Sequence, residues 1–309
     1  MGGSAPRLRH FKLADVRFPE LPKLHLFAPH LVHLTISHTR LPWFISSEGM
    51  AALLSALSSL KTVCLEFESL DLPSGSDRES PPSSKRSISP ALESFGFRGD
   101  VEYLVNLVTF IDAPQLDSFI CFFDRIDVKS PRLAQFVHRT PTLGALDQVH
   151  MQFGYRSTSI GYSPSESSVD NLWLGITCRQ PDWELLFSEQ VFNSLHPLST
   201  VENFYIEHSN PLFWDSDAVE NTSWLELLLP STAVKNLYLP EKVAPGIADA
   251  LQELGPGRMT ELLPGLESIF VEGLILSVQL QENIQKFVAA RHLSGHVITV
   301  SLWVMSRHQ

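Results

Sequence analysis

The chain has 309 residues, of which 44% are hydrophobic and 18% charged, and its formal charge is −11. This composition is enough to bury one large core or two smaller ones. The excess of acidic residues argues against a nucleic-acid partner, because the phosphates of a nucleic acid would be repelled. Cys64, Cys121 and Cys178 are far apart and form no C-x-x-C pair, which excludes a disulfide framework and a thiolate zinc site and indicates a reducing compartment.

The sequence carries no sign of membrane insertion or secretion. Its N-terminal residues have no apolar core of the kind found in signal peptides, and no stretch approaches the ~20 apolar residues of a membrane span. We therefore expect a soluble protein of the cytoplasm or nucleus, with no membrane partner.

A short apolar motif recurs along the chain: an apolar residue, two variable ones, an apolar residue, one variable one and a further apolar residue. Its later copies begin at Val201, Val234, Leu266 and Val297, which are 33, 32 and 31 residues apart, whereas the earlier steps are 23, 29, 32 and 24. The copies are Leu8/Phe11/Leu13, Leu31/Leu34/Ile36, Leu60/Val63/Leu65, Leu92/Phe95/Phe97, Leu116/Phe119/Cys121, Val201/Phe204/Ile206, Val234/Leu237/Leu239, Leu266/Ile269/Val271 and Val297/Val300/Leu302. A fixed internal period of this length is typical of stacked repeats.

Each copy predicts a strand whose fourth and sixth motif positions point inward, because side chains alternate between the two faces of a strand. Between the copies, apolar residues at helical spacing predict a returning helix; for example, Leu280, Ile284 and Phe287 share one stripe that ends before Gly295. In chain order the further elements that we expect are a helix over 131–139, strands over 146–153 and 171–178, and helices over 181–195, 217–229, 241–254 and 278–293.

A strand–helix unit of this size cannot bury its own apolar face, so neighbouring units must stack. The sequence therefore predicts an α/β fold, a single solenoid over residues 1–309 with repeats of about 23–33 residues and a curved parallel sheet. Its first motif copy begins at Leu8 without a polar cap, so the start of the chain looks cut, whereas the strand at 297–302 is expected to close the last repeat.

Two polar segments interrupt the repeats. Residues 71–89 are rich in Ser and Pro and predict a mobile insertion, and residues 155–168 predict a shorter flexible loop. Ser80 and Ser89 precede prolines inside the first segment and are candidate phosphorylation sites, the alternative being that the segment is simply a tolerated insertion.

No motif of a catalytic, metal-binding or cofactor-binding site is present. There is no nucleophile elbow, and the histidines at 25, 30, 33 and 38 do not have the spacing of a metal site. Gly255-Pro256-Gly257 is better explained as the end of a helix than as a phosphate loop, because no G-K-S/T follows it. We therefore predict no catalytic residue, no metal and no cofactor, although an enzyme whose groups come from distant residues stays open.

The variable motif residues between the inward pair line up on one exposed face of the stacked strands. Aromatic residues among polar ones resemble the centre of a protein interface, and we expect Tyr205, Tyr238, Phe270 and Trp303 to occupy corresponding places. The alternative is that some of them are ordinary packing. The predicted partner-binding residues are Asn203, Tyr205, Glu207, Asn236, Tyr238, Ser268, Phe270, Glu272 and Trp303.

Several strings of the chain resemble the leucine-rich-repeat region of fungal F-box proteins. They are CRQPDWELLFSEQVFNSLHPLSTVENFYI at 178–206, NTSWLELLLPSTAVKNLYL at 221–239, ALQELGPGRMTELLPGLESIFVEGL at 250–274 and ENIQKFVAARHLSGHVITVSLW at 282–303, with 111–119 and 130–143 as weaker matches. The resemblance implies a leucine-rich-repeat-like solenoid that acts as the substrate-recognition arm of a cullin-RING ubiquitin ligase.

The resemblance also implies a target protein of unknown identity as the partner. No F-box is present in the chain, so a ligase adaptor is expected only if an F-box lies upstream of Met1. The alternatives are a truncated or decayed product of such a gene, or a scaffold without ligase function.

Overall fold

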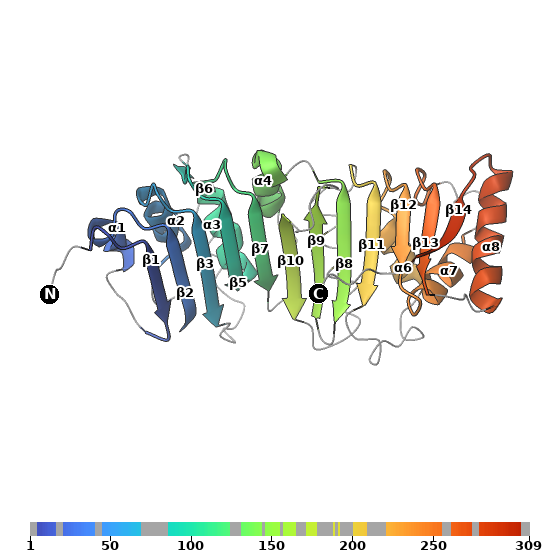
Figure 1. The fold of residues 1–309 in the computed structure, drawn as a ribbon, viewed down its shortest axis with the longest axis horizontal. Helices are drawn as coiled ribbons and strands as arrows, with labels where there is room; N and C mark the ends of the chain where they lie inside the picture. Colours follow the sequence, from blue (N-terminus) through green and yellow to red (C-terminus); the bar gives the residue numbers. More distant parts are fainter. Residues whose placement is uncertain are drawn as a thin grey trace. The chain divides into compact units, whose positions relative to one another are not determined.

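The structure is a computed structural model that covers the 309 residues. It describes residues 5–16, 21–40, 45–68, 86–123, 131–143, 146–154, 157–164, 171–177, 188, 191, 200–208, 221–254, 261–273 and 278–303, with the backbone alone at 38–40, 68 and 279. The chain is mixed α/β with a large, mostly parallel sheet, which confirms the predicted α/β class (Figure 1). It divides into two compact units, residues 1–145 with 171–174, and residues 146–170 with 175–309.

The first unit holds five parallel strands in the order β1-β2-β3-β5-β7, followed by the start of β10. A separate parallel pair is formed by β4 and β6. Its elements are β1 (His10–Ala14), α1 (Leu24–Phe27), β2 (His33–Arg40), α2 (Ser47–Ala56), β3 (Thr62–Glu68), β4 (Ser87–Ile88), β5 (Ser94–Gly99), α3 (Val101–Phe110), β6 (Ile111–Asp112), β7 (Ser118–Phe123) and α4 (Pro131–Arg139).

The second unit holds strands in the order β9-β8-β11-β12-β13-β14. All of these neighbours are parallel except β8 and β9, which are antiparallel. Its elements are β8 (Gln148–Gly154), β9 (Ser157–Ser163), the end of β10 (Leu172–Thr177), β11 (Asn203–His208), α6 (Asn221–Leu228), β12 (Asn236–Leu239), α7 (Ala244–Gln252), β13 (Ser268–Glu272), α8 (Val278–Leu293) and β14 (Thr299–Trp303).

The strand register aligns the motif copies with one another. In the second unit Phe204 pairs with Leu237, Leu237 with Ile269 and Ile269 with Val300, so the fourth motif positions meet on adjacent strands. In the first unit the same position is occupied by Phe11, Leu34, Val63, Phe95 and Phe119 in consecutive strands. A period of two keeps these side chains on the same face of the sheet. They form the core of each unit except on the two end strands, where Phe11 is only partly buried and Val300 is exposed.

Helices cover the face of the sheet to which these apolar side chains point. In Figure 1, α2 and α3 lie behind the strands of the first unit, and α6 and α7 lie behind β12 and β13. The Ser46 hydroxyl accepts a hydrogen bond from Gly49 N–H at 3.1 Å, and the Asp100 carboxylate accepts from Glu102 and Tyr103. These side chains begin α2 and α3 by satisfying backbone donors that a helix start leaves without partners.

The helices predicted over 131–139 and 278–293 are confirmed with the same bounds. Those predicted over 217–229 and 241–254 are confirmed as Asn221–Leu228 and Ala244–Gln252. The helix predicted over 181–195 falls on residues of which only 188 and 191 are described.

The flexible loop predicted over 155–168 is wrong for residues 157–163, which form β9. Thr158, Ile160 and Tyr162 are buried, and β9 runs antiparallel to β8. The sequence did not reveal this strand because only Ile160 and Tyr162 are large apolar residues, and they stand among serines. So short a strand becomes stable only when a neighbouring strand supplies its hydrogen bonds.

The last strand differs from the expectation that it closes the final repeat. Val300 and Leu302 occupy the inward motif positions of β14 but are 37% and 48% exposed, whereas Val271 on β13 is fully buried. In the chain order α8 precedes β14, and in the described part of the chain no helix follows to cover these two side chains. The inward positions of β14 are therefore an apolar surface.

Candidate functional site

The outward side chains of the second unit form rows across the parallel strands. The middle row contains a stack of rings, which we call the aromatic ladder: His150 on β8, Tyr205 on β11, Tyr238 on β12 and Phe270 on β13. Successive ring centroids are 4.4, 4.1 and 4.5 Å apart, with interplanar angles of 4°, 11° and 9°. In-register parallel strands place equivalent side chains about 4.8 Å apart, which suits the stacking of flat rings.

Sequence reasoning found three members of the ladder and missed His150. The signal was present, because His150 stands between the buried residues Val149 and Met151 and so must point outward. It was missed because Leu146/Val149/Met151, a further copy of the repeated motif that brings β8 into line with β11, was not recognised among the repeats.

Trp303 does not continue the ladder, and the expectation that it corresponds to Phe270 is wrong. The register pairs Phe270 with Ser301, and Trp303 with Glu272, two residues further along the strand. The Trp303 ring instead lies edge-on to Tyr238 and Tyr205, with centroid distances of 5.3 and 6.3 Å. The indole therefore packs against the ladder from β14 and belongs to the same surface by contact.

Polar groups border the ladder on both sides. On one side the Asn236 side-chain N–H donates to the Asn203 amide oxygen at 2.9 Å, and the hydroxyls of Ser268 and Thr299 are 2.9 Å apart. On the other side Glu207 Oε1 lies 3.1 Å from His150 Nδ1. All nine predicted partner-binding residues thus lie on the strands of the second unit, in or beside the ladder.

Half-burial of the ladder changes its electrostatics. The pKa of Tyr205 is raised well above its usual value, first by burial and then by the charge of the Tyr238 side chain and a hydrogen bond with it. Tyr205 is therefore neutral at physiological pH, and the charge beside the ladder comes from carboxylates. A flat stack of rings with hydrogen-bonding borders has the composition of the centre and rim of a protein interface.

Ser80 lies outside the described residues, but Ser89 is placed clearly and is a poor phosphorylation site. It is 4% exposed, its N–H donates to Asp112 O at 2.8 Å, and its hydroxyl is buried without a partner among the described residues. The predicted mobile segment 71–89 therefore ends in ordered structure, since residues 87 and 88 form β4.

The burial of Ser89 follows from the repeat. The Leu92 N–H donates to Ser89 O in a turn that leads into β5. The same turn recurs before β2, β3, β7 and β13, where the residue in the place of Ser89 is Ala28, Leu57, Ala113 and Leu263 respectively, each of them buried. Ser89 therefore occupies a core position that a single sequence motif, Ser-Pro, could not distinguish from a surface site.

We expect Ser89→Asp, which imitates the charge of a phosphate, to lower the free energy of unfolding by about 3 kcal/mol, because an unpaired carboxylate would be buried. Ser89→Ala should be neutral or stabilising by up to about 1 kcal/mol, because it removes a buried hydroxyl without a partner. The control is Ile88→Asp at the neighbouring residue, which is 60% exposed. Urea denaturation followed by circular dichroism measures all three, and equal effects of Ser89→Asp and Ile88→Asp would contradict the burial of Ser89.

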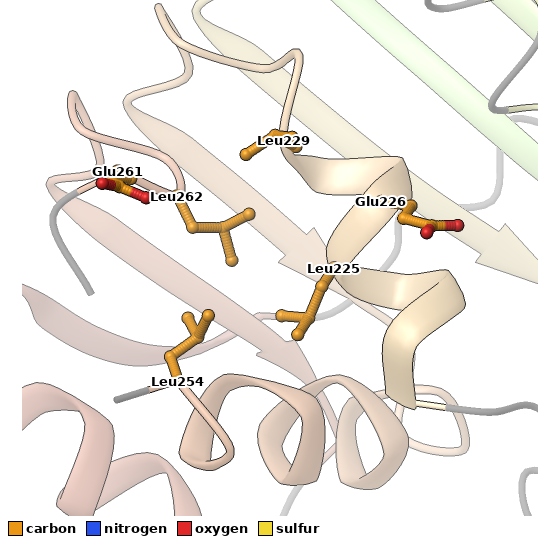
Figure 2. A pocket seen from close by; sticks show the side chains of 6 residues that line it. All are labelled: Leu225, Glu226, Leu229, Leu254, Glu261 and Leu262. Atoms are coloured by element: carbon orange, nitrogen blue, oxygen red, sulfur yellow. The ribbon is translucent and has the colours of Figure 1, made fainter. Parts of the chain in front are cut away.

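A second surface feature is a small hollow on the helical side of the second unit. It is lined by Leu225, Glu226, Leu229, Leu254, Glu261 and Leu262. Figure 2 shows Leu225, Leu254 and Leu262 pointing toward one another, while the Glu226 side chain points away. Only apolar groups converge here, so the hollow offers no arrangement for catalysis.

The chain matches none of the models of known protein families, and no curated protein is similar enough to it in sequence to count as a relative. Among the described residues, no helix is both long enough and apolar enough to pass through a bilayer. The same residues contain no group of three or more His, Cys, Asp or Glu side chains arranged to hold a metal ion.

Proposed function

We propose that this chain is a non-catalytic protein-interaction module, a leucine-rich-repeat-like solenoid that binds a target protein through its strand face. The observation that carries this function is the aromatic ladder. Its rings are half-buried on the sheet face opposite to the helices of the described chain. Polar side chains usually occupy such a face, so a stack of aromatic rings there is unexpected.

A repeated backbone pattern supports the solenoid. The N–H groups of Lys235 and Asn236 both donate to Glu202 O at 2.9 and 3.0 Å, and those of Glu267 and Ser268 both donate to Lys235 O at 2.8 and 2.9 Å. The same paired bonds occur in the first unit, where Glu93 and Ser94 donate to Lys61 O. Each repeat thus enters its strand by one geometry, which is the behaviour of stacked repeat units.

The resemblance to the repeat region of fungal F-box proteins supports a narrower role, that of a substrate-recognition arm in a ubiquitin ligase of the cytoplasm or nucleus. An adaptor would be engaged only through an F-box upstream of Met1. A single solenoid over 1–309 remains a prediction, as do the truncated product and the scaffold without ligase function.

The test is a comparison of proteins captured from native lysate by the full chain and by a triple variant, Tyr205→Ala, Tyr238→Ala and Phe270→Ala. We expect proteins held by the wild type to be lost at least tenfold with the variant, because the central apolar residues of an interface carry most of its binding energy.

The matched control replaces exposed apolar residues away from the ladder, Val278 and Leu293 on α8, which are 74% and 89% exposed. Circular dichroism establishes that each variant is folded. Equal capture by the folded triple variant and the wild type would move the binding surface away from the strand face.

A further inference from the structure

The aromatic ladder has an open end at Phe270. One face of the Phe270 ring stacks on Tyr238 at 4.5 Å. On the other side the register partner is Ser301 on β14, an exposed residue whose short side chain carries no ring. Since β14 is the last strand in the order, the stack of flat groups stops one position before the sheet does.

An acidic group stands beside this open end. Glu272 follows Phe270 by two residues on the same face of β13 and has no ion-pair partner among the described residues. Glu207, in contrast, is paired with His150. The outward positions of β8 and β11 to β14 contain these two carboxylates and, in the described chain, neither lysine nor arginine.

Trp303 borders the open end of the ladder on another side. It is the register partner of Glu272 and follows Ser301 by two residues on β14, while its ring reaches across to Tyr238. The open position is therefore bordered by a ring face at Phe270, a short floor at Ser301, and a carboxylate and an indole at the next register position.

We propose that this position binds an arginine side chain from a basic segment of the partner protein. A guanidinium group is planar, so it can occupy the next place in the stack over Ser301, and its N–H groups can pair with the Glu272 carboxylate. Lysine offers charge without a flat surface and fits the site less well. The charge of the chain, −11, attracts a basic segment over a longer range.

This inference rests on the proposed function, because it names the chemistry of the partner that the strand face would hold. The probes are three peptides of equal length, in which glycine alternates with arginine, with lysine or with glutamate. Binding to the full chain is measured by calorimetry at low and at physiological salt. We expect the arginine peptide to bind at least fivefold more tightly than the lysine peptide, and the glutamate peptide not to bind.

Two variants test the position itself. Glu272→Gln removes the carboxylate charge and should weaken binding of the arginine peptide at least tenfold. Ser301→Tyr should abolish it by placing a ring where the guanidinium would stack. The matched control is Glu282→Gln at an exposed glutamate of α8, which removes the same charge away from the ladder and should leave binding unchanged.

The outcomes separate the two proposals. If Glu272→Gln and Glu282→Gln weaken binding equally, or if Ser301→Tyr has no effect, the peptide is held by the overall negative charge of the chain, and the arginine site is overturned. If the triple variant of the ladder no longer captures the proteins that the wild type holds, while the wild type binds no arginine peptide, the arginine site is overturned and the proposed function stands. If the arginine peptide binds at Glu272 while the triple variant captures every protein that the wild type holds, the arginine site stands and the proposed function is overturned.

Discussion

Trp224→Ala is expected to lower the free energy of unfolding by about 3–5 kcal/mol, the usual cost of truncating a large aromatic residue in a core. Trp224 lies on α6, is 1% exposed, and meets the Phe153 ring of β8 edge-on at 6.1 Å. A Cβ atom at Gly246 on α7 would lie 3.2 Å from Trp224 Nε1, so the indole also fills the space where the two helices approach. Its loss leaves a cavity that neither helix can close without moving.

The matched control is Leu229→Ala, directly after α6, because Leu229 is 48% exposed. We expect it to change the unfolding free energy by less than about 0.5 kcal/mol. Urea denaturation followed by fluorescence and circular dichroism compares the two variants. Similar midpoints for Trp224→Ala and Leu229→Ala would contradict the packing of α6 on the sheet.

Arg291→Ala is expected to destabilise the protein by at least about 3 kcal/mol, because it opens a cavity and removes the hydrogen bonds that the guanidinium group donates to two carbonyl groups. Arg291 lies near the end of α8, is fully buried, and donates to Leu263 O at 2.9 Å and Pro264 O at 3.5 Å. Leu263 has a φ of 49°, a left-handed conformation that is costly for leucine, and the hydrogen bond from Arg291 holds its carbonyl in place.

Burial opposes this contribution, since it lowers the pKa of the Arg291 guanidinium by penalising its charge. Arg291→Met separates the two effects, because it keeps most of the volume but donates no hydrogen bond. We expect a loss of about 1–3 kcal/mol for Arg291→Met and almost none for Lys286→Met, an exposed position of the same helix. A Met variant as stable as the wild type would show that the hydrogen bonds do not outweigh the cost of burying the charge.

For the strands that carry it, the repeated motif was sufficient to predict their positions and their relative register. Phe204, Leu237 and Ile269 occupy the same place in successive motif copies, and the structure pairs them directly. This worked because strand geometry forces alternate residues to one face, so a periodic apolar pattern specifies both the strand and its inward side. The ends of α8 were predictable for a similar reason, since apolar residues stand at both of its ends, whereas α4 begins at Pro131, a residue that suits the first position of a helix.

The ladder itself was only partly predictable. Tyr205, Tyr238 and Phe270 follow from their motif positions, but the contact of Trp303 with Tyr238 depends on a side chain that reaches across β13. His150 joins the ladder through the pairing of β8 with β11, two strands that are separated by more than 45 residues in the chain. The motif copy Leu146/Val149/Met151 predicts the inward face of β8, but the sequence between β8 and β11 does not specify that the two strands are neighbours.

The sequence by itself determined where the strands that carry the repeated motif lie, which of their faces is apolar and where two helices begin and end, because these depend on local patterns. Only the tertiary structure decided that β9 is a strand, that Ser89 is buried and that Val300 is exposed. Each of these depends on which other parts of the chain pack against the residue. Burial is a property of neighbours brought together by folding, and the order of residues along the chain does not specify it.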